Sequence, residues 1–349
     1  MPEKAERSHQ NANSANKTLS VETKINKMTA KSALPLIRTL NTKQKKLFNH
    51  IYSWCCQKVK GNNPEPFHIF LNGGAGTGKS RVIHAIKYIG DKMFSRESEN
   101  PEDESVLVMA YTGTAAFQVA GQTVHHSLKI RNYGPNYIPL AEKNIAELRE
   151  KIGNTKIIVI EEVSMINKDL LNFISERLCQ LTRKDDAPFG GMSVLAVGDF
   201  YQIPPVFGPN KMLCMEDKGE VVSLWENFKI WELDEVMRQN DDLEYAQLLN
   251  RLRVKTREIP LNQGDQQILQ NRVITSEKRK RELQSVIHIF ATNKQIDRHN
   301  RKILEDSPGL EIQIAAADVP KKVGACEKRT TPVSKCDSRL PSHVSLKVG

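Results

Sequence analysis

The spacing G-x-x-x-x-G-K-[ST] combines three residue types that together can hold a chain of phosphates. Glycines let several backbone N–H groups converge on one anion, the lysine reaches the outer phosphates, and the hydroxyl can bind Mg²⁺. An apolar run at 68–71 precedes the match and a helical pattern at 81–86 follows it, which places the loop at a helix N-terminus. The matching residues are Gly73, Gly74, Ala75, Gly76, Thr77, Gly78, Lys79 and Ser80. The motif therefore predicts binding of a nucleoside triphosphate together with Mg²⁺.

Two adjacent carboxylates follow the apolar run at 157–160. Glu161 and Glu162 stand at the C-terminal end of a predicted buried strand, the edge at which ligands bind in open parallel sheets. One acid can hold Mg²⁺ through water, and the next can orient an attacking water. Paired acids at a strand end are also often only solvated. The phosphate loop predicted at the same edge favours the chemical interpretation.

A further apolar run at 194–197 ends in Asp199 and Gln202, whose polar side chains can sense a terminal phosphate. Similar runs precede the phosphate loop and Glu161, and another lies at 106–110. Continuous apolar runs of this length are typical of strands buried on both faces of a parallel sheet. Four such strands with helical segments between them predict an α/β fold, a doubly wound parallel sheet with helices on both faces.

Small and hydroxyl-bearing residues follow the strand predicted at 106–110. Backbone can approach a ligand closely here, and hydroxyl and imidazole groups can contact a sugar-phosphate backbone. The histidine pair that begins at His125 could instead ligate a metal, although the sequence shows no third ligand. Both interpretations stay open. The candidate nucleic-acid contacts are Thr112, Gly113, Thr114, Thr123 and His125.

Upstream of the phosphate loop, Thr42 is predicted to cap a helix whose apolar face includes Leu47 and Ile51. Gln44 lies just inside this helix. Its side-chain amide has both donors and an acceptor, so it could pair with both edges of an adenine. On spacing alone, a solvated surface glutamine is the favoured alternative.

Composition and charge narrow the class of protein. The 349 residues allow about two domains, and 39% hydrophobic with 26% charged residues is typical of a globular protein. The net charge of +10 favours a polyanionic partner. No apolar run reaches about 18 residues, so no membrane association is expected. The six cysteines form no C-x-x-C pair, which predicts reduced thiols in an intracellular protein rather than a zinc site.

The pattern changes along the chain predict its domains. A polar, disordered tail is expected at 1–34, a first nucleotide-binding domain at 35–235, and a partial second domain at 236–349. Within the second domain the apolar run at 286–290 predicts a strand, and residues 307–349 are predicted to be poorly ordered.

One basic segment in the second domain allows two interpretations. The run at 278–281 has the composition of a solvated helix face. It could alternatively serve as a nuclear-import signal or a nucleic-acid contact.

Taken in order, these segments resemble the petite-integration-frequency (Pif) family of DNA helicases, RecD-like members of helicase superfamily one. The resemblance runs from about Leu40 to Asn300. Its motifs are Leu40-Asn41-x-x-Gln44, Gly73 to Ser80, Thr112 to Ala116 with Thr123 and His125, Ile160 to Met165, Gly198-Asp199-Phe200-x-Gln202-x-Pro204-Pro205, and Arg238-Gln239.

The resemblance implies two RecA-like domains, the second incomplete here, that close on ATP and move 5′ to 3′ along single-stranded DNA. The implied activity is that of an ATP hydrolase and ATP-dependent DNA helicase in DNA repair, recombination or telomere maintenance. A nuclear location is favoured over mitochondrion or cytoplasm, and a monomer is favoured. The implied roles are phosphate binding by Lys79, Mg²⁺ binding by Ser80 and Glu161, adenine recognition by Gln44, water activation by Glu162, γ-phosphate sensing by Gln202, and an arginine finger at Arg238.

Three departures from the family pattern qualify the resemblance. Glu161 stands where the family has aspartate, and a carboxylate displaced by about 1 Å can cost about 100-fold in rate. His126 stands where serine is common. The later motifs of the second domain are not found, so a truncated chain is expected. The alternative function is an ATP- and single-strand-binding fragment without unwinding activity, such as a transposon-derived copy, and a P-loop ATPase that acts on protein is a third.

Overall fold

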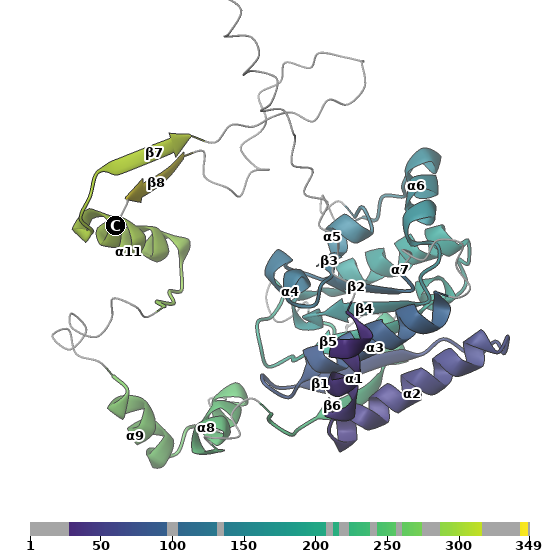
Figure 1. The fold of residues 1–349 in the computed structure, drawn as a ribbon, viewed down its shortest axis with the longest axis horizontal. Helices are drawn as coiled ribbons and strands as arrows, with labels where there is room; N and C mark the ends of the chain where they lie inside the picture. Colours follow the sequence, from purple (N-terminus) through teal and green to yellow (C-terminus); the bar gives the residue numbers. More distant parts are fainter. Residues whose placement is uncertain are drawn as a thin grey trace, which may run out of the picture. The chain divides into compact units, whose positions relative to one another are not determined.

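The computed structural model describes residues 28–95, 104–130, 136–206, 212–215, 223–237, 243–255, 260–273, 287–315 and 343–347 (Figure 1). The chain divides into two compact units, Met1–Gln267 and Ile268–Gly349. Each predicted site residue that the structure describes belongs to the first unit.

A six-stranded sheet forms the centre of the first unit, in the order β3-β2-β4-β5-β1-β6. Every neighbouring pair of strands is parallel, so the predicted α/β fold with a parallel sheet is confirmed. The strands are β1 His68–Gly73, β2 Val106–Ala110, β3 Gln122–Thr123, β4 Ile157–Glu161, β5 Ser193–Gly198 and β6 Lys229–Leu233.

Successive residues of the central strands enter two different cores, because side chains alternate between the two faces of a sheet. In β4, Ile158 and Ile160 belong to one core, whereas Ile157 and Val159 belong to the other. Helices cover both faces (Figure 1). Those over one core are α2 Thr42–Val59 and α3 Lys79–Phe94, and those over the other are α6 Glu142–Ile152 and α7 Lys168–Thr182.

The N-terminus of α2 differs in one residue from the sequence expectation. Asn41, and not Thr42, is the cap. Its side chain accepts a hydrogen bond from the Gln44 N–H at 2.9 Å, while the Gln44 side chain accepts one from the Asn41 N–H at 3.0 Å. This reciprocal capping box satisfies two N–H groups that a helix start leaves unpaired.

Shorter elements complete the first unit. The helices among them are α1 Ala30–Arg38, α4 Gly113–Gln118, α5 Val124–Ser127 and α8 Leu243–Arg253, and the 3₁₀ turns are Val163–Met165, Pro188–Gly191 and Leu224–Asn227. Helix α9 Gln263–Asn271 begins in the first unit and ends in the second. Because α1 starts at Ala30, the disordered tail predicted for 1–34 is too long; residues 1–27 lie outside the described part of the chain.

The boundary predicted at residues 235 and 236 is also displaced. Helix α8 lies beyond it and yet belongs to the first unit. Its last residue, Arg253, forms an ion pair with Asp199 at the end of β5, and Leu248 of the same helix is fully buried. These contacts fasten α8 to the nucleotide-binding domain.

The second unit contains helix α11 Asn293–Asp306 and an antiparallel pair of strands, β7 Glu311–Ala315 and β8 His343–Lys347. The poor order predicted for 307–349 is therefore wrong for these two strands. Residues 287–290 are not a strand, contrary to the expectation for 286–290. The basic run at 278–281 lies outside the described residues.

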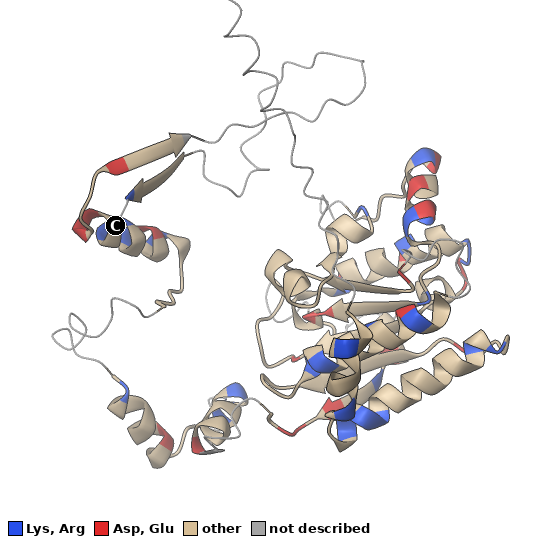
Figure 2. Ribbon diagram, in the orientation of Figure 1, with Lys and Arg blue, Asp and Glu red and all other residues tan. Residues whose placement is uncertain are grey.

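Charge is distributed unevenly over the helices (Figure 2). Helix α2 carries four lysines and no acidic residue, whereas α6 intersperses both signs. Lys43 of α2 forms an exposed ion pair with Asp234 at 2.7 Å. Such exposed pairs contribute little to stability, so the lysines of α2 chiefly add positive charge to the surface of this domain.

Candidate functional site

The phosphate loop joins β1 to α3, as its spacing predicts. Lys79, the first residue of α3, folds back over the loop and donates hydrogen bonds to the carbonyl oxygens of Gly73 at 2.8 Å and Gly74 at 3.2 Å. Burial lowers the pKa of the Lys79 ammonium group, and the nearby carboxylates of Glu161, Glu162 and Asp199 act in the opposite direction. The ammonium group of this partly buried lysine is therefore held against the backbone of the loop.

Two positions in the loop require glycine for different reasons. A Cβ on Gly73 would lie 2.6 Å from the Thr77 hydroxyl oxygen, which itself donates to the Gly74 carbonyl at 2.9 Å. Gly78 has a φ of +82°, the left-handed region, and a Cβ there would also collide with the Gln44 amide. The tight loop leaves no space for side chains at these points.

Gln44 is fully buried between α2 and the phosphate loop. In addition to the capping box, its amide nitrogen donates to the Thr77 carbonyl at 2.9 Å. The solvated surface glutamine favoured by spacing alone is therefore wrong. Gln44 fastens the start of α2 to the loop, and adenine recognition by this residue stays a prediction.

Glu161 is the last residue of β4, and Glu162 follows it directly. Glu161 is 6% exposed, and its Oε2 atom has no hydrogen-bond partner within the described residues. Burial raises the pKa of Glu161 to about 7; attraction to Lys79 opposes this rise and repulsion from Glu162 adds to it. Glu162 has a φ of +54°, a conformation that costs a non-glycine residue energy and is often kept at functional sites.

Asp199, a buried carboxylate that directly follows β5, accepts hydrogen bonds from several neighbouring polar groups. Asp199 accepts hydrogen bonds from the Tyr201 N–H at 3.1 Å and the Gln202 side chain at 3.1 Å, and from Arg253 at 2.7 Å through each oxygen. Burial alone would raise the pKa of Asp199, but these hydrogen bonds, that of Arg253 first, hold it below its usual value. Gln202 thus lies where the sequence predicted a phosphate sensor, and the role itself stays a prediction.

Sequence reasoning did not identify Arg253 as part of this site. The arginine lies 54 residues beyond its carboxylate partner, at the end of a helix assigned to another domain. The sequence shows that this helix carries arginines, but it does not indicate which residues they contact. The structure brings the guanidinium group to Asp199 and to the first residues of the phosphate loop.

The predicted arginine finger, Arg238, lies outside the described residues. The residue before it is described: the Met237 N–H donates to the Gly76 carbonyl of the phosphate loop at 2.8 Å. The Asn41 side chain also contacts the Met237 sulfur at 3.8 Å. The chain therefore passes directly beside the loop one residue before Arg238.

The five predicted nucleic-acid contacts gather at the carboxyl edge of β2 and β3, which are neighbours in the sheet. Thr112 caps α4 by accepting the Ala115 N–H at 3.2 Å, and Thr123 caps α5 by accepting the His126 N–H at 3.3 Å. Both hydroxyls thus stabilise helix starts. Gly113 and Thr114 form the first turn of α4, and His125 lies in α5.

Aromatic side chains also lie at this carboxyl edge of β2 and β3. The His125 ring packs edge-on against Tyr111, with ring centroids 5.8 Å apart, while Phe117 of α4 is 86% exposed. The exposure of Phe117 could not be predicted from the sequence pattern. Across the described ranges, no group of three His, Cys, Asp or Glu side chains could hold a metal, so the metal-binding interpretation of the histidine pair gains no support.

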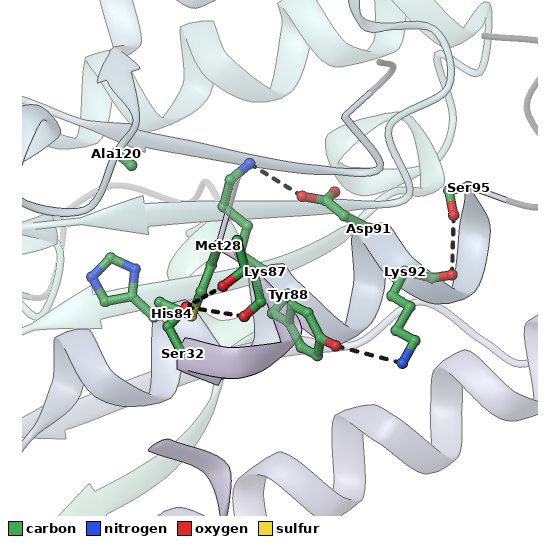
Figure 3. A pocket seen from close by; sticks show the side chains of 10 residues that line it. Met28, Ser32, His84, Lys87, Tyr88, Asp91, Lys92, Ser95 and Ala120 are labelled. Atoms are coloured by element: carbon green, nitrogen blue, oxygen red, sulfur yellow. Dashed lines mark hydrogen bonds and ion pairs between the residues drawn. The ribbon is translucent and has the colours of Figure 1, made fainter. Parts of the chain in front are cut away.

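A separate cavity of about 560 Å³ lies beside α3 (Figure 3). Its lining includes Lys87, whose ammonium group contacts Asp91 at 3.4 Å and Glu104 at 3.0 Å and donates to the Val106 carbonyl at 3.2 Å. The charge of this lysine is therefore neutralised within the protein. Among the described residues that line the cavity, none is a predicted site residue.

Among the residues that the structure describes, no helix is both long enough and apolar enough to cross a membrane.

The parallel sheet, its phosphate loop and the carboxylates at its carboxyl edge define a RecA-like P-loop domain. The chain belongs to the PIF1-like helicase family, whose family model matches residues 39–282. The resemblance inferred from the sequence motifs is thereby confirmed.

Two curated relatives illustrate how far the similarity extends. ATP-dependent DNA helicase RRM3 of Saccharomyces cerevisiae is 27% identical over 265 residues, which covers 72% of this chain and 33% of the relative. ATP-dependent DNA helicase PIF1 of Emericella nidulans is 36% identical over 194 residues, which covers 53% and 24%, respectively. The chain thus spans a third or less of the length of these relatives.

Solved structures agree on the fold. The crystal structure of Pif1 helicase from Candida albicans aligns with a TM-score of 0.60 at 23% identity, covering 89% of this chain and 63% of that chain. Pif1 helicase from Bacteroides in complex with ADP-AlF3 and ssDNA aligns with a TM-score of 0.57 at 22% identity, covering 89% and 64%. Likeness at this level of identity shows the shared fold.

Proposed function

We propose that this chain hydrolyses ATP and couples the hydrolysis to the unwinding of DNA. The observation that supports this most strongly is the position of Lys79, partly buried on the phosphate loop within electrostatic reach of Glu161, Glu162 and Asp199. One cation and three carboxylates at the carboxyl edge of a parallel sheet meet the needs of phosphoryl transfer from a Mg²⁺-bound nucleotide. The relatives, which are named ATP-dependent DNA helicases, supply the substrate class.

The phosphates of ATP would bind where Lys79 now contacts the loop. The backbone N–H groups from Gly74 to Ser80 and the N-terminus of α3 favour an anion there. Lys79 would exchange the carbonyls of Gly73 and Gly74 for phosphate oxygens, which removes the cost of burying its charge. For adenine recognition, Gln44 would use the second N–H of its amide, because the first donates to Thr77.

The residues present fit Mg²⁺. The buried and unpaired Oε2 atom of Glu161 is an acceptor of the hard oxygen type that this ion prefers, directly or through water. The hydroxyl of Ser80, in the first turn of α3, would be the second protein ligand. When bound, Mg²⁺ neutralises phosphate charge. A nearby dication also lowers the pKa of a carboxyl group, which would keep Glu161 ionised.

The remaining site residues would act on the attacking water and on the terminal phosphate. Glu162 would accept the proton of the water, Gln202 would contact the γ-phosphate while Asp199 orients its amide, and Arg238 would stabilise the charge that develops. These roles are supported by three observations: Glu162 directly follows the last residue of β4, the Gln202 side chain donates to Asp199 after β5, and the N–H of Met237, the residue before Arg238, donates to the phosphate loop.

Single-stranded DNA is the proposed partner, bound at the edge formed by α4 and α5. Hydroxyl, imidazole and backbone groups there suit a sugar-phosphate backbone, and an exposed aromatic ring such as Phe117 can stack on a base. We place the protein, acting as a monomer that moves 5′ to 3′, in DNA repair, recombination or telomere maintenance in the nucleus.

Strand displacement tests the proposal. The full chain is given ATP, Mg²⁺ and a duplex with either a 5′ or a 3′ single-stranded tail. We expect release of the displaced strand from the 5′-tailed duplex only, and none with Glu162→Gln, which should still bind nucleotide. Displacement from the 3′-tailed duplex alone would contradict the polarity, and displacement by Glu162→Gln would contradict the role of that residue.

A second candidate function is ATP and single-strand binding without unwinding. It is favoured by the second unit, whose described residues contain an antiparallel strand pair rather than a parallel sheet that could close over a nucleotide. Hydrolysis of ATP stimulated by DNA, without strand displacement from either duplex, would support this candidate over the first.

A further inference from the structure

Arg253 and Asp199 form a paired hydrogen-bond fork at the end of β5. The Arg253 Nε and Nη2 atoms each donate to one Asp199 oxygen at 2.7 Å. Asp199 is fully buried, whereas the Arg253 side chain is 22% exposed. Bidentate pairs of this type are strong and fix the orientation of the guanidinium plane, so the last residue of α8 is held in one direction.

The guanidinium group lies against the phosphate loop. A Cβ built on Gly74 would be 3.6 Å from Arg253 Nε and 3.7 Å from its Cζ. The carbonyl oxygen of Gly74 is also one of the two that Lys79 contacts. Two cations, one from α3 and one from α8, therefore meet at the first residues of the loop, and their mutual repulsion is reduced when a polyanion binds between them.

The surroundings of Arg253 connect it to the proposed phosphate sensor. Its guanidinium carbon lies 4.8 Å from the centre of the Tyr201 ring, and that residue is 61% exposed. Gln202 donates to the same Asp199 oxygen that binds Arg253 Nε. One carboxylate thus holds both groups, so a ligand that draws Arg253 away also changes the contacts of Gln202.

We propose that Arg253 binds the terminal phosphate of the nucleotide, and that Asp199 holds the arginine when this phosphate is absent. The proposal rests on ATP binding at the phosphate loop, as set out above. Arginine suits the task because it keeps its charge and can bind two oxygens at once. Exchange between Asp199 and phosphate would couple α8, which precedes the second unit in the sequence, to the presence of the γ-phosphate.

Nucleotide binding by variants of the full chain tests this proposal. Affinities for ADP and for the non-hydrolysable imido analogue of ATP are measured by isothermal titration calorimetry. We expect Arg253→Ala to weaken the triphosphate analogue by about tenfold or more, the scale of a lost charge-assisted bond, and ADP by less than about twofold. Arg253→Lys, which keeps the charge without the fork, should fall between Arg253→Ala and the wild type.

Asp199→Asn separates phosphate binding from a purely structural ion pair. It removes the competitor for Arg253 while keeping the side-chain shape, so affinity for the triphosphate analogue should rise. If the pair only fastened α8 to the sheet, Asp199→Asn and Arg253→Ala would weaken both nucleotides alike, and that result would overturn the proposal. Unchanged affinities in both variants would overturn it as well.

Two further variants complete the design. Arg251 lies on the same helix and makes a similar fork to Asp265, at 2.8 and 2.6 Å. Arg251→Ala should leave both affinities unchanged, and a loss equal to that of Arg253→Ala would count against the proposal. Lys79→Ala tests the underlying nucleotide site by itself: unchanged affinities there would refute ATP binding at the loop, whatever Arg253 does.

Discussion

Replacing Glu161 by glutamine should make the nucleotide-free protein more stable, and increasingly so as the pH rises. The pKa of Glu161 is raised from 4.5 to about 7 in the folded state, chiefly by burial. The folded state therefore binds its proton more tightly than the unfolded state does. Stability is greatest below about pH 4.5 and falls as the pH rises through about 7, because folding then requires either a proton or a buried charge.

The size of the effect follows from these two pKa values. The stability lost through Glu161 amounts to about 1 kcal/mol at about pH 5.5 and about 3 kcal/mol at about pH 8. Glutamine has the same shape and does not titrate. The difference in unfolding free energy between Glu161→Gln and the wild type should therefore grow by about 2 kcal/mol between these pH values. Urea unfolding followed by tryptophan fluorescence measures it.

The neighbouring carboxylate provides the control. Glu162 is less buried than Glu161, and Glu162→Gln removes the same formal charge from the same strand end. A difference for Glu161→Gln that is constant with pH, or that is matched by Glu162→Gln, would refute the argument that burial controls Glu161.

Three further predictions concern single contacts. Gln44→Ala should lower the unfolding free energy by about 1–3 kcal/mol, because Thr77 O and the Asn41 N–H lose their partner in a buried place. Gly78→Ala should lower it by more than about 1 kcal/mol and weaken nucleotide binding, since the residue has a positive φ and no room for a Cβ. Phe117→Ala should leave stability unchanged and weaken single-stranded DNA binding, measured by fluorescence anisotropy, by about 5- to 150-fold.

Matched variants isolate each of these effects. Gln57 is an exposed glutamine on the same helix as Gln44, and equal destabilisation by Gln57→Ala would contradict the role given to burial. Gly61 also has a positive φ but open space around it, so Gly61→Ala should cost less than Gly78→Ala. Ile230, an exposed apolar residue on β6, should be replaceable by alanine without loss of DNA affinity.

The sequence was sufficient where the determinants of structure are local. The apolar runs that became β4 and β5 predicted buried parallel strands because each is shorter than a helix and bounded by polar residues. The phosphate loop was predicted in full, since its glycines, lysine and hydroxyl lie within eight consecutive residues. The carboxylates Glu161 and Asp199 followed from their position after these strands.

The sequence was not sufficient to predict contacts between residues that lie far apart along the chain. The burial of Gln44 depends on the Thr77 carbonyl, 33 residues away, and the capping box with Asn41 determines its orientation. Arg253 could not be paired with Asp199 because ordinary residue spacing carries no information about contacts between α8 and β5. The domain boundary was misplaced for the same reason.

Our main proposal is that ATP hydrolysis at the phosphate loop drives the unwinding of DNA. Its most direct test is the rate of ATP hydrolysis by the full chain, measured with and without single-stranded DNA, in the wild type and in Lys79→Ala. We expect hydrolysis that single-stranded DNA stimulates in the wild type, and a rate at least about 100-fold lower in Lys79→Ala, which lacks the loop cation. Equal rates in the two proteins, or a wild-type rate indifferent to DNA at low salt, would contradict it.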